Sequence, residues 1–114
     1  MKKALIICNA VMSSSLMAKK ATDFFKAKNV PIELDATTVS KSSEFFKKGE
    51  FDLYLVSPQI KMYYDQIDKE ANASDKLVAN IPPQAYIPTE DGVSNLAKLT
   101  FTELKPLLQA EKNG

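Results

Sequence analysis

The stretch that decides the fold is ALIICNAVMSSS, residues 4–15. Its first four residues form a continuous apolar run, which is typical of a short strand buried on both faces of a parallel sheet. A polar loop follows Cys8, and Ser13, Ser14 or Ser15 can then cap a helix. The stretch therefore predicts a buried strand that runs directly into a helix.

Outward from this stretch, strand and helix patterns alternate to the end of the chain. Further strands are expected at 31–38, 51–56 and 76–81, because apolar and β-branched residues gather there between turn residues. The strand at 31–38 alternates between apolar and polar residues, so it should be half exposed or near a sheet edge. Asn29 and Gly49 are suitable stops for the first and second helices.

Helix signals fill the segments between these strands. The residues that recur at helical spacing on the inner face of the first helix are expected to be Leu16, Met17, Ala21, Phe24, Phe25 and Lys28. The second helix should open near residues 40–43, and the third should have Ser57 as its N-cap and Pro58 at its first position. The last helix is expected to start near residues 90–92, and Pro106 should break or kink it.

The order of the elements predicts an α/β fold. Strands that alternate with helices form a single open parallel sheet of four strands with helices on both faces, and residues 1–114 should make one domain. Residues 4–7 are the most apolar strand and should be central. Ligands bind such sheets beyond the carboxyl ends of the central strands, which is where Cys8 lies. We therefore expect a phosphatase-like cysteine loop after the first strand.

Composition removes several function classes. The 114 residues carry a net charge of +1, and all 15 basic residues are lysines, so there is no clustered excess of charge for nucleic acid. The chain has no histidine, which excludes a Ser-His-Asp triad, a Cys-His dyad and a His-ligated zinc. The carboxylates show no metal-ligand spacing, and no cofactor is expected. Without arginine, a phosphate must be held by backbone amides, hydroxyls or lysines.

Nothing in the sequence suggests insertion into a membrane. No stretch approaches the ~20 apolar residues of a spanning helix, and polar Asn9 interrupts the N-terminal apolar run too early for a signal peptide. The single cysteine cannot form a disulfide within the chain. We expect a soluble cytoplasmic protein.

Cys8 is the residue on which a chemical function can be built. Backbone N–H groups at the start of a helix attract anions, and a thiolate and a phosphoryl group are both anions. We expect Cys8 to be a reactive thiolate that carries a phosphoryl group, and not a buried structural thiol. A small core cysteine is the alternative interpretation of the same position.

Two cysteine motifs with known chemistry are absent. Tyrosine phosphatases use Cys-x5-Arg, and here Ser14 stands at the arginine position, which disfavours hydrolysis of a phosphoenzyme. Val11 stands where a Cys-x-x-Cys redox motif would have its second cysteine. These absences favour transfer of a phosphoryl group to another acceptor.

Three segments carry a resemblance to a known family. Residues 8–17 read Cys-Asn-Ala-Val-Met-Ser-Ser-Ser-Leu-Met against a family pattern of Cys-x-x-Gly-Met-Ser-Thr-Ser-Leu-Leu. Residues 57–60 read Ser-Pro-Gln-Ile against Gly-Pro-Gln-Ile, and a Tyr followed by Asp-Gly precedes the last helix. Over about residues 3–110 the chain resembles the IIB component of the lactose/cellobiose family of the bacterial phosphoenolpyruvate-dependent sugar phosphotransferase system.

The resemblance implies a phosphocarrier, that is, a protein-phosphocysteine–sugar phosphotransferase. Cys8 would accept a phosphoryl group from a phosphohistidine on a IIA protein and pass it to a sugar bound by the membrane IIC component, through which the protein would transiently reach the inner face of the membrane. The implied phosphate-binding loop is Asn9, Ala10, Val11, Met12, Ser13, Ser14 and Ser15, with the hydroxyls of Ser13 and Ser15 as extra donors. The implied site rim or partner surface is Pro58, Gln59, Tyr63 and Tyr86.

Two departures from the family pattern keep alternatives open. Val11 and Ser57 stand where the family has glycine, and a β-branched Val11 would be strained if its position needed a positive φ. A low-molecular-weight phosphatase-like hydrolase is one alternative function. A non-catalytic regulatory domain of the same fold is the other.

Overall fold

A parallel four-stranded sheet forms the centre of the molecule. The computed structural model describes residues 2–9 and 11–113, with the side chains of all of these except 11–13 and 111–113. The strands are β1 (Lys2–Cys8), β2 (Ile32–Thr38), β3 (Leu53–Val56) and β4 (Leu77–Asn80). Their order in the sheet is β2-β1-β3-β4, and every neighbouring pair is parallel. The expected open parallel sheet is confirmed, with β1 in its interior.

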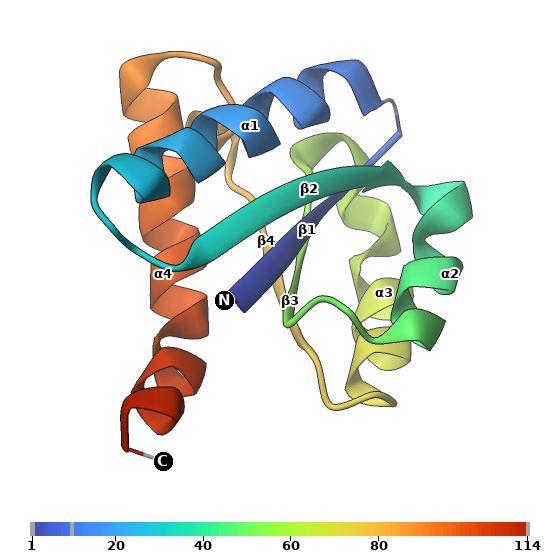
Figure 1. Ribbon diagram of the computed structural model, residues 1–114. Coiled ribbons are helices and arrows are strands. Elements are labelled where there is room, and N and C mark those ends of the chain that lie inside the picture. Colours follow the sequence, from blue (N-terminus) through green and yellow to red (C-terminus); the bar gives the residue numbers. More distant parts are fainter. Residues whose placement is uncertain (1, 10, 114) are drawn as a thin grey trace.

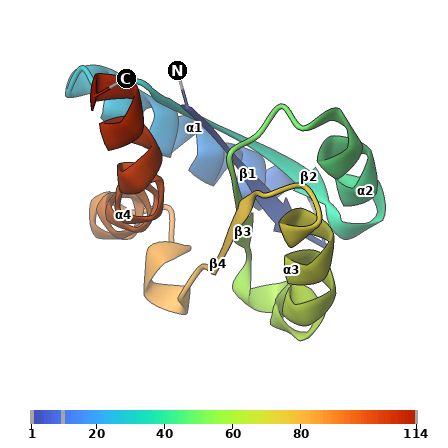
Figure 2. The same ribbon diagram turned by 90° about the horizontal axis from the view of Figure 1, so that it is seen from below.

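Helices cover both faces of this sheet. They are α1 (Val11–Ala27), α2 (Val39–Lys48), α3 (Tyr64–Asn72) and α4 (Glu90–Asn113), with short 3₁₀ segments η1 (Pro58–Tyr63) and η2 (Pro83–Ala85). Helices α1 and α4 lie on one side of the sheet, and α2 and α3 lie on the other (Figures 1 and 2). In the described part of the chain, no helix combines the length and apolar character that crossing a membrane requires.

Alternate residues of β1 face the two helical layers. Ala4 and Ile6 belong to the core under α1 and α4, whereas Leu5 and Ile7 belong to the core under α2 and α3. All four side chains have no exposed surface. This burial on both faces confirms the expectation drawn from the apolar run.

Strand β2 forms an edge, as its alternating pattern predicts. Glu33 and Asp35 are exposed, and Ile32 and Leu34 are buried. The alternation fails at Thr37, which is only 3% exposed. The reason is that α2 begins one residue after β2 and packs against the end of this strand.

Helix α1 begins earlier than expected. It starts at Val11, so the three serines lie in its first two turns and do not cap it. The buried face also differs from the expected one: among residues 14–27, the buried residues are Ser14, Met17, Ala18, Ala21, Thr22 and Phe25. Leu16, which was expected in the core, is 45% exposed.

The ends of α1 and α2 follow the sequence signals. Asn29 has a φ of 57°, and the N–H groups of Val30 and Asn29 donate to the carbonyls of Phe25 and Lys26, which is the Schellman arrangement. Gly49 has a φ of 66° and donates its N–H to Phe45. Both expected helix stops are confirmed.

Two expectations about later helices are corrected. Pro58 begins η1 and not a continuous α-helix, because Ile60 has non-helical dihedrals (φ −121°, ψ 24°). Helix α4 is continuous from Glu90 to Asn113 although Pro106 lies inside it. Pro106 removes a hydrogen bond to the carbonyl of Thr102. Both residues are exposed, so water can replace that bond.

Candidate functional site

The candidate site lies at the topological switch point of the sheet, where the order of the strands reverses. Cys8 is the last residue of β1, at the carboxyl edge of the sheet. From β1 the chain goes first to β2 on one side and later to β3 on the other, so the switch point lies between β1 and β3. Open parallel sheets hold their ligands at this point. The expected position of Cys8 is confirmed.

The thiol of Cys8 is enclosed by hydrogen-bonding groups. Its sulfur lies 2.8 Å from the hydroxyl oxygen of Ser14, and the thiol donates to the backbone carbonyl of Thr37 at 3.6 Å. Only 1% of Cys8 is exposed, so the thiol is buried, contrary to the expectation. The burial arises because β2 pairs in register along β1 and α1 packs over the end of β1. Its reactivity stays a prediction.

Among the described side chains of the three serines, Ser14 contacts the sulfur and Ser15 does not. Ser14 has no exposed surface and shares the buried face of α1 with Met17. Ser15 is exposed, because the next residue of a helix is rotated by about 100°. The side chain of Ser13 lies outside the described residues. The helix start at Val11 thus places Ser14 in the first turn of α1, within reach of Cys8.

The rest of the expected phosphate-binding loop is described only in part. Asn9 is exposed, and Ala10 lies outside the described residues. The backbone of Val11 and Met12 belongs to α1, and the structure does not describe their side chains. Helical residues have negative φ, so the backbone of α1 does not impose on Val11 the strain that a glycine-specific conformation would bring.

The four expected rim residues reach the same edge of the sheet from two connections. Pro58, Gln59 and Tyr63 belong to η1, which follows β3. Tyr86 follows η2, after β4, and packs as a half-buried side chain against the core under α1 and α4. Tyr63 is 43% exposed. The structure thus places them at the carboxyl edge, and their function stays a prediction.

Two polar groups at this edge of the sheet were not predicted to belong to the site. One is the carbonyl of Thr37, which accepts from the thiol. The other is Ser57, which directly follows β3 at the switch point and has no exposed surface. Parallel strands end at a common edge, so the residues at the ends of the second and third predicted strands were the available signal.

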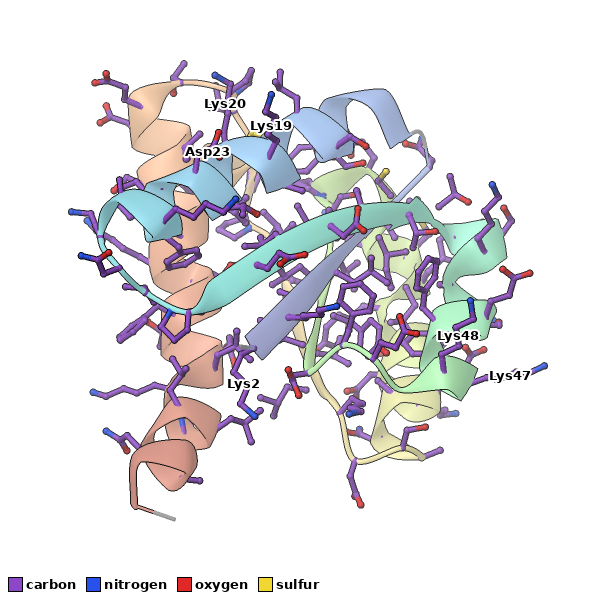
Figure 3. All side chains as sticks on the ribbon, viewed as in Figure 1. Lys2, Lys19, Lys20, Asp23, Lys47 and Lys48 are labelled. Carbon is purple, nitrogen blue, oxygen red and sulfur yellow. The ribbon has the colours of Figure 1, made fainter. Side chains whose placement is uncertain are left out.

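The charged side chains of α1 near the site face solvent. Lys19 and Lys20 are exposed on the outer side of the helix (Figure 3). Ser14, in contrast, faces the sheet. The described side-chain and backbone groups on the sulfur include a hydroxyl and a backbone carbonyl, both neutral.

Fold and site together define a class: a doubly wound α/β domain with a cysteine at its switch point. A family model for the lactose/cellobiose-specific IIB subunit of the PTS system matches residues 3–98. The chain is 30% identical over 86 residues to the oligo-beta-mannoside-specific EIIB component of the PTS system of Bacillus subtilis (strain 168), covering 75% of this chain and 82% of that relative. The chain belongs to the lactose/cellobiose-specific IIB family.

Two solved structures share the fold of this chain. The lactose-specific IIB component domain of the phosphoenolpyruvate:carbohydrate phosphotransferase system from Streptococcus pneumoniae superposes with a TM-score of 0.77 at 16% identity, covering 90% of this chain and 96% of that one. The cellobiose-specific phosphotransferase IIB component from Borrelia burgdorferi gives a TM-score of 0.69 at 19% identity, with 92% and 93% covered. IIB components are sugar-specific parts of this phosphotransferase system and work with IIA and IIC partners.

Proposed function

We propose that this protein is a phosphocarrier that takes a phosphoryl group onto Cys8 from a phosphohistidine of a IIA protein. It then passes the group to a sugar bound by the membrane IIC component, and it works as a single cytoplasmic domain. The observation that carries the proposal is the 2.8 Å contact between the Cys8 sulfur and the Ser14 hydroxyl at the switch point of a IIB-family chain. This contact places a hydroxyl beside the only cysteine of the sequence.

The proposed chemistry consists of two phosphoryl transfers. In the first, the deprotonated sulfur of Cys8 attacks phosphorus, the S–P bond forms, and the P–N bond breaks with its electron pair returning to the imidazole of IIA. In the second, a sugar hydroxyl oxygen attacks phosphorus, loses its proton, and the S–P electron pair returns to Cys8. Donors aimed at the phosphoryl oxygens stabilise the charge that develops in both steps.

The residue types of this chain suit transfer better than hydrolysis. The chain has no arginine to clamp a phosphoryl group and no histidine to activate water. The first step needs a deprotonated Cys8, and the second needs a base for the sugar hydroxyl. We expect the partners to supply these proton acceptors. Hydroxyls and backbone amides hold the group without trapping it, which favours its onward transfer.

Burial of the thiol adds a requirement to this scheme. With 1% of Cys8 exposed, a donor protein cannot reach the sulfur in the conformation described here. The residues that cover it must move when IIA or IIC docks. Movements of this kind accompany the binding of many partner proteins.

The test is to locate the phosphoryl group. The protein is incubated with phosphoenolpyruvate, the general phosphotransferase proteins and IIA proteins of the same bacterium, and intact and peptide masses are measured. One added phosphoryl group on Cys8, absent from a folded Cys8→Ser variant, is expected. Lack of Cys8 phosphorylation with every IIA protein of that bacterium would contradict the proposal.

Two further assays separate the proposed function from the two alternatives. A phosphatase-like hydrolase would turn over an aryl phosphate in a Cys8-dependent manner, and we expect no such turnover. A non-catalytic regulatory domain would keep its biological role in a Cys8→Ser variant. We expect that variant to abolish sugar uptake through the partner IIC.

A further inference from the structure

Ser57 has a buried hydroxyl with no hydrogen-bond partner among the described residues. Its side chain has no exposed surface, and its Oγ contacts no donor or acceptor within the part of the chain that the structure describes. Buried polar groups are nearly always paired, because an unpaired one forfeits its hydrogen bonds to water. An unpaired hydroxyl in a native protein therefore requires an explanation.

Strand pairing places Ser57 beside Cys8. Ile7 of β1 lies opposite Val56 of β3, and the N–H of Ser57 donates to the carbonyl of Ile7 at 3.0 Å. The pairing of β1 with the chain that follows β3 thus continues by one residue, so Cys8 and Ser57 are neighbours on adjacent strands. Adjacent strands are about 4.8 Å apart, which is close enough for two side chains to share one ligand.

Both side chains belong to the same face of the sheet. Leu53 and Leu55 of β3 pack in the core under α1 and α4, and so does Ile6 of β1. Residues two apart in a strand share a face. Ser57 is two residues beyond Leu55, and Cys8 is two residues beyond Ile6, so both lie on the α1 side, where Ser14 contacts the sulfur.

The local fold does not use the Ser57 hydroxyl. Ser57 precedes η1 in an N-cap position, but its side chain makes no capping hydrogen bond. Its backbone is extended (φ −68°, ψ 156°), a conformation that alanine and glycine also adopt. Ser57 also stands where the IIB pattern described above has glycine. The hydroxyl is therefore available for a ligand.

We propose that the Ser57 hydroxyl donates a hydrogen bond to an oxygen of the phosphoryl group on Cys8. The inference rests on the proposed function, since it assumes a phosphocysteine. The added group places three anionic oxygens at the switch point. Ser14 reaches them from α1, and Ser57 reaches them from the end of β3. Phosphorylation supplies the partner that Ser57 lacks in the unmodified protein.

The test compares Ser57→Ala and Ser57→Gly with a matched control. The control is Ser42→Ala, which removes another buried serine hydroxyl, one that donates to the carbonyl of Val39 at 2.7 Å. Each variant is mixed with phosphorylated IIA, and the rate of phosphocysteine formation and its level at equilibrium are followed by quenched mass spectrometry. The melting temperature of each unmodified variant is recorded beside these values.

The two serines should respond in opposite ways. We expect both Ser57 variants to lower the rate or the equilibrium level of phosphocysteine roughly 10- to 100-fold, as loss of a hydrogen bond to a charged group does. The melting temperature of Ser57→Ala should stay the same or rise, because an unpaired buried hydroxyl is removed. Ser42→Ala should lower the melting temperature and leave transfer unchanged.

The outcomes separate this inference from the proposed function. If the wild-type protein is never phosphorylated on Cys8, the proposed function fails and this inference fails with it. If the wild type is phosphorylated and both Ser57 variants match it, only this inference is overturned. A parallel fall of melting temperature and transfer in both Ser57 variants would give Ser57 a structural role and would also overturn it. The ³¹P resonance of the phosphocysteine, which we expect to shift in both Ser57 variants, is a further readout that stability does not affect.

Discussion

The hydroxyl oxygen of Ser14 lies 2.8 Å from the sulfur of Cys8, although six positions separate them in the chain. The contact exists because β1 ends at Cys8 and α1 begins at Val11. The first turn of the helix therefore folds back over the strand end, with Ser14 on its buried face. A single turn of chain thus brings the Cys8 thiol and the Ser14 hydroxyl together.

Removal of the Ser14 hydroxyl should slow phosphoryl transfer. We expect Ser14→Ala to reduce the rate of phosphocysteine formation about 10-fold and to lower the free energy of unfolding by about 1 kcal/mol, because one buried hydrogen bond is lost. Ser15→Ala changes the exposed neighbour. It should leave the transfer rate unchanged and the free energy of unfolding within about 0.5 kcal/mol of wild type. Quenched-flow transfer assays and urea unfolding measure the two effects. Equal transfer rates in the two variants would contradict the assigned function of Ser14.

Tyr54 should make the protein sensitive to alkaline pH. Burial, with a smaller effect of the negative charge of Asp52, raises the pKa of Tyr54 from 10.0 to about 12. The folded state therefore holds this proton more tightly than the unfolded state does. The resulting stabilisation is complete below pH 10 and is lost as the pH rises through about 12.

The alkaline effect can be isolated with a pair of tyrosine variants. The free energy of unfolding, measured in urea across this pH range, should fall less steeply in Tyr54→Phe than in the wild type. Tyr63→Phe alters an exposed tyrosine and should keep the wild-type slope. Identical slopes for Tyr54→Phe and the wild type would show that Tyr54 does not carry the effect.

Gly92 should resist substitution although it lies in a helix. Gly-to-Ala changes inside helices usually stabilise by up to about 1 kcal/mol. Here a Cβ on Gly92 would overlap the backbone carbonyl of Ile87. We expect Gly92→Ala to destabilise by about 1–3 kcal/mol in urea unfolding, as overpacking does. Ser94→Ala, in the same turn, should be neutral, and a stabilised Gly92→Ala protein would refute the close approach.

Pro106 should weaken the helix that it does not break. Replacing it with alanine restores an N–H that can donate to Thr102, within α4 (Glu90–Asn113). We expect Pro106→Ala to slow amide exchange in the turn that follows and to raise the free energy of unfolding by about 1 kcal/mol. This gain is less than the ~3 kcal/mol of a helix centre, because the exposed end frays. Lys105→Ala, an exposed neighbour, should change neither quantity.

Much of the fold could be predicted because local signals agree with the packing. The apolar run at residues 4–7 needs burial on both faces, and β1 has that burial. Asn29 and Gly49 adopt the left-handed conformations that end their helices. At these places the intrinsic preference of the residue and its tertiary environment lead to the same structure.

Helix starts were harder to predict because the local signals allow more than one start. Three serines in a row favour a helix that begins after them. The observed helix begins at Val11 and extends the face of Met17 and Ala21 back to Ser14, which has no exposed surface. Met17 and Ala21 would lie in the helix with either start, so their spacing does not decide between the two.

The site could be predicted in kind but not in detail. Cys8 was found from its place at the end of an apolar run. Its neighbours depend on the helical phase for Ser14 and on strand register for Ser57, and neither is visible in a local pattern. The register follows from the pairing of Ile7 with Val56, which are far apart in the chain.

Enclosure of the Cys8 sulfur also bears on how long the protein survives oxidative conditions. Peroxide and disulfide reagents attack exposed thiolates fastest. A sulfur in a residue that is 1% exposed meets them only after its covering residues have moved. The movement that uncovers Cys8 would therefore limit both its phosphorylation by the donor and its oxidation to sulfenic acid. A variant that loosens this end of the molecule should lose activity faster in peroxide.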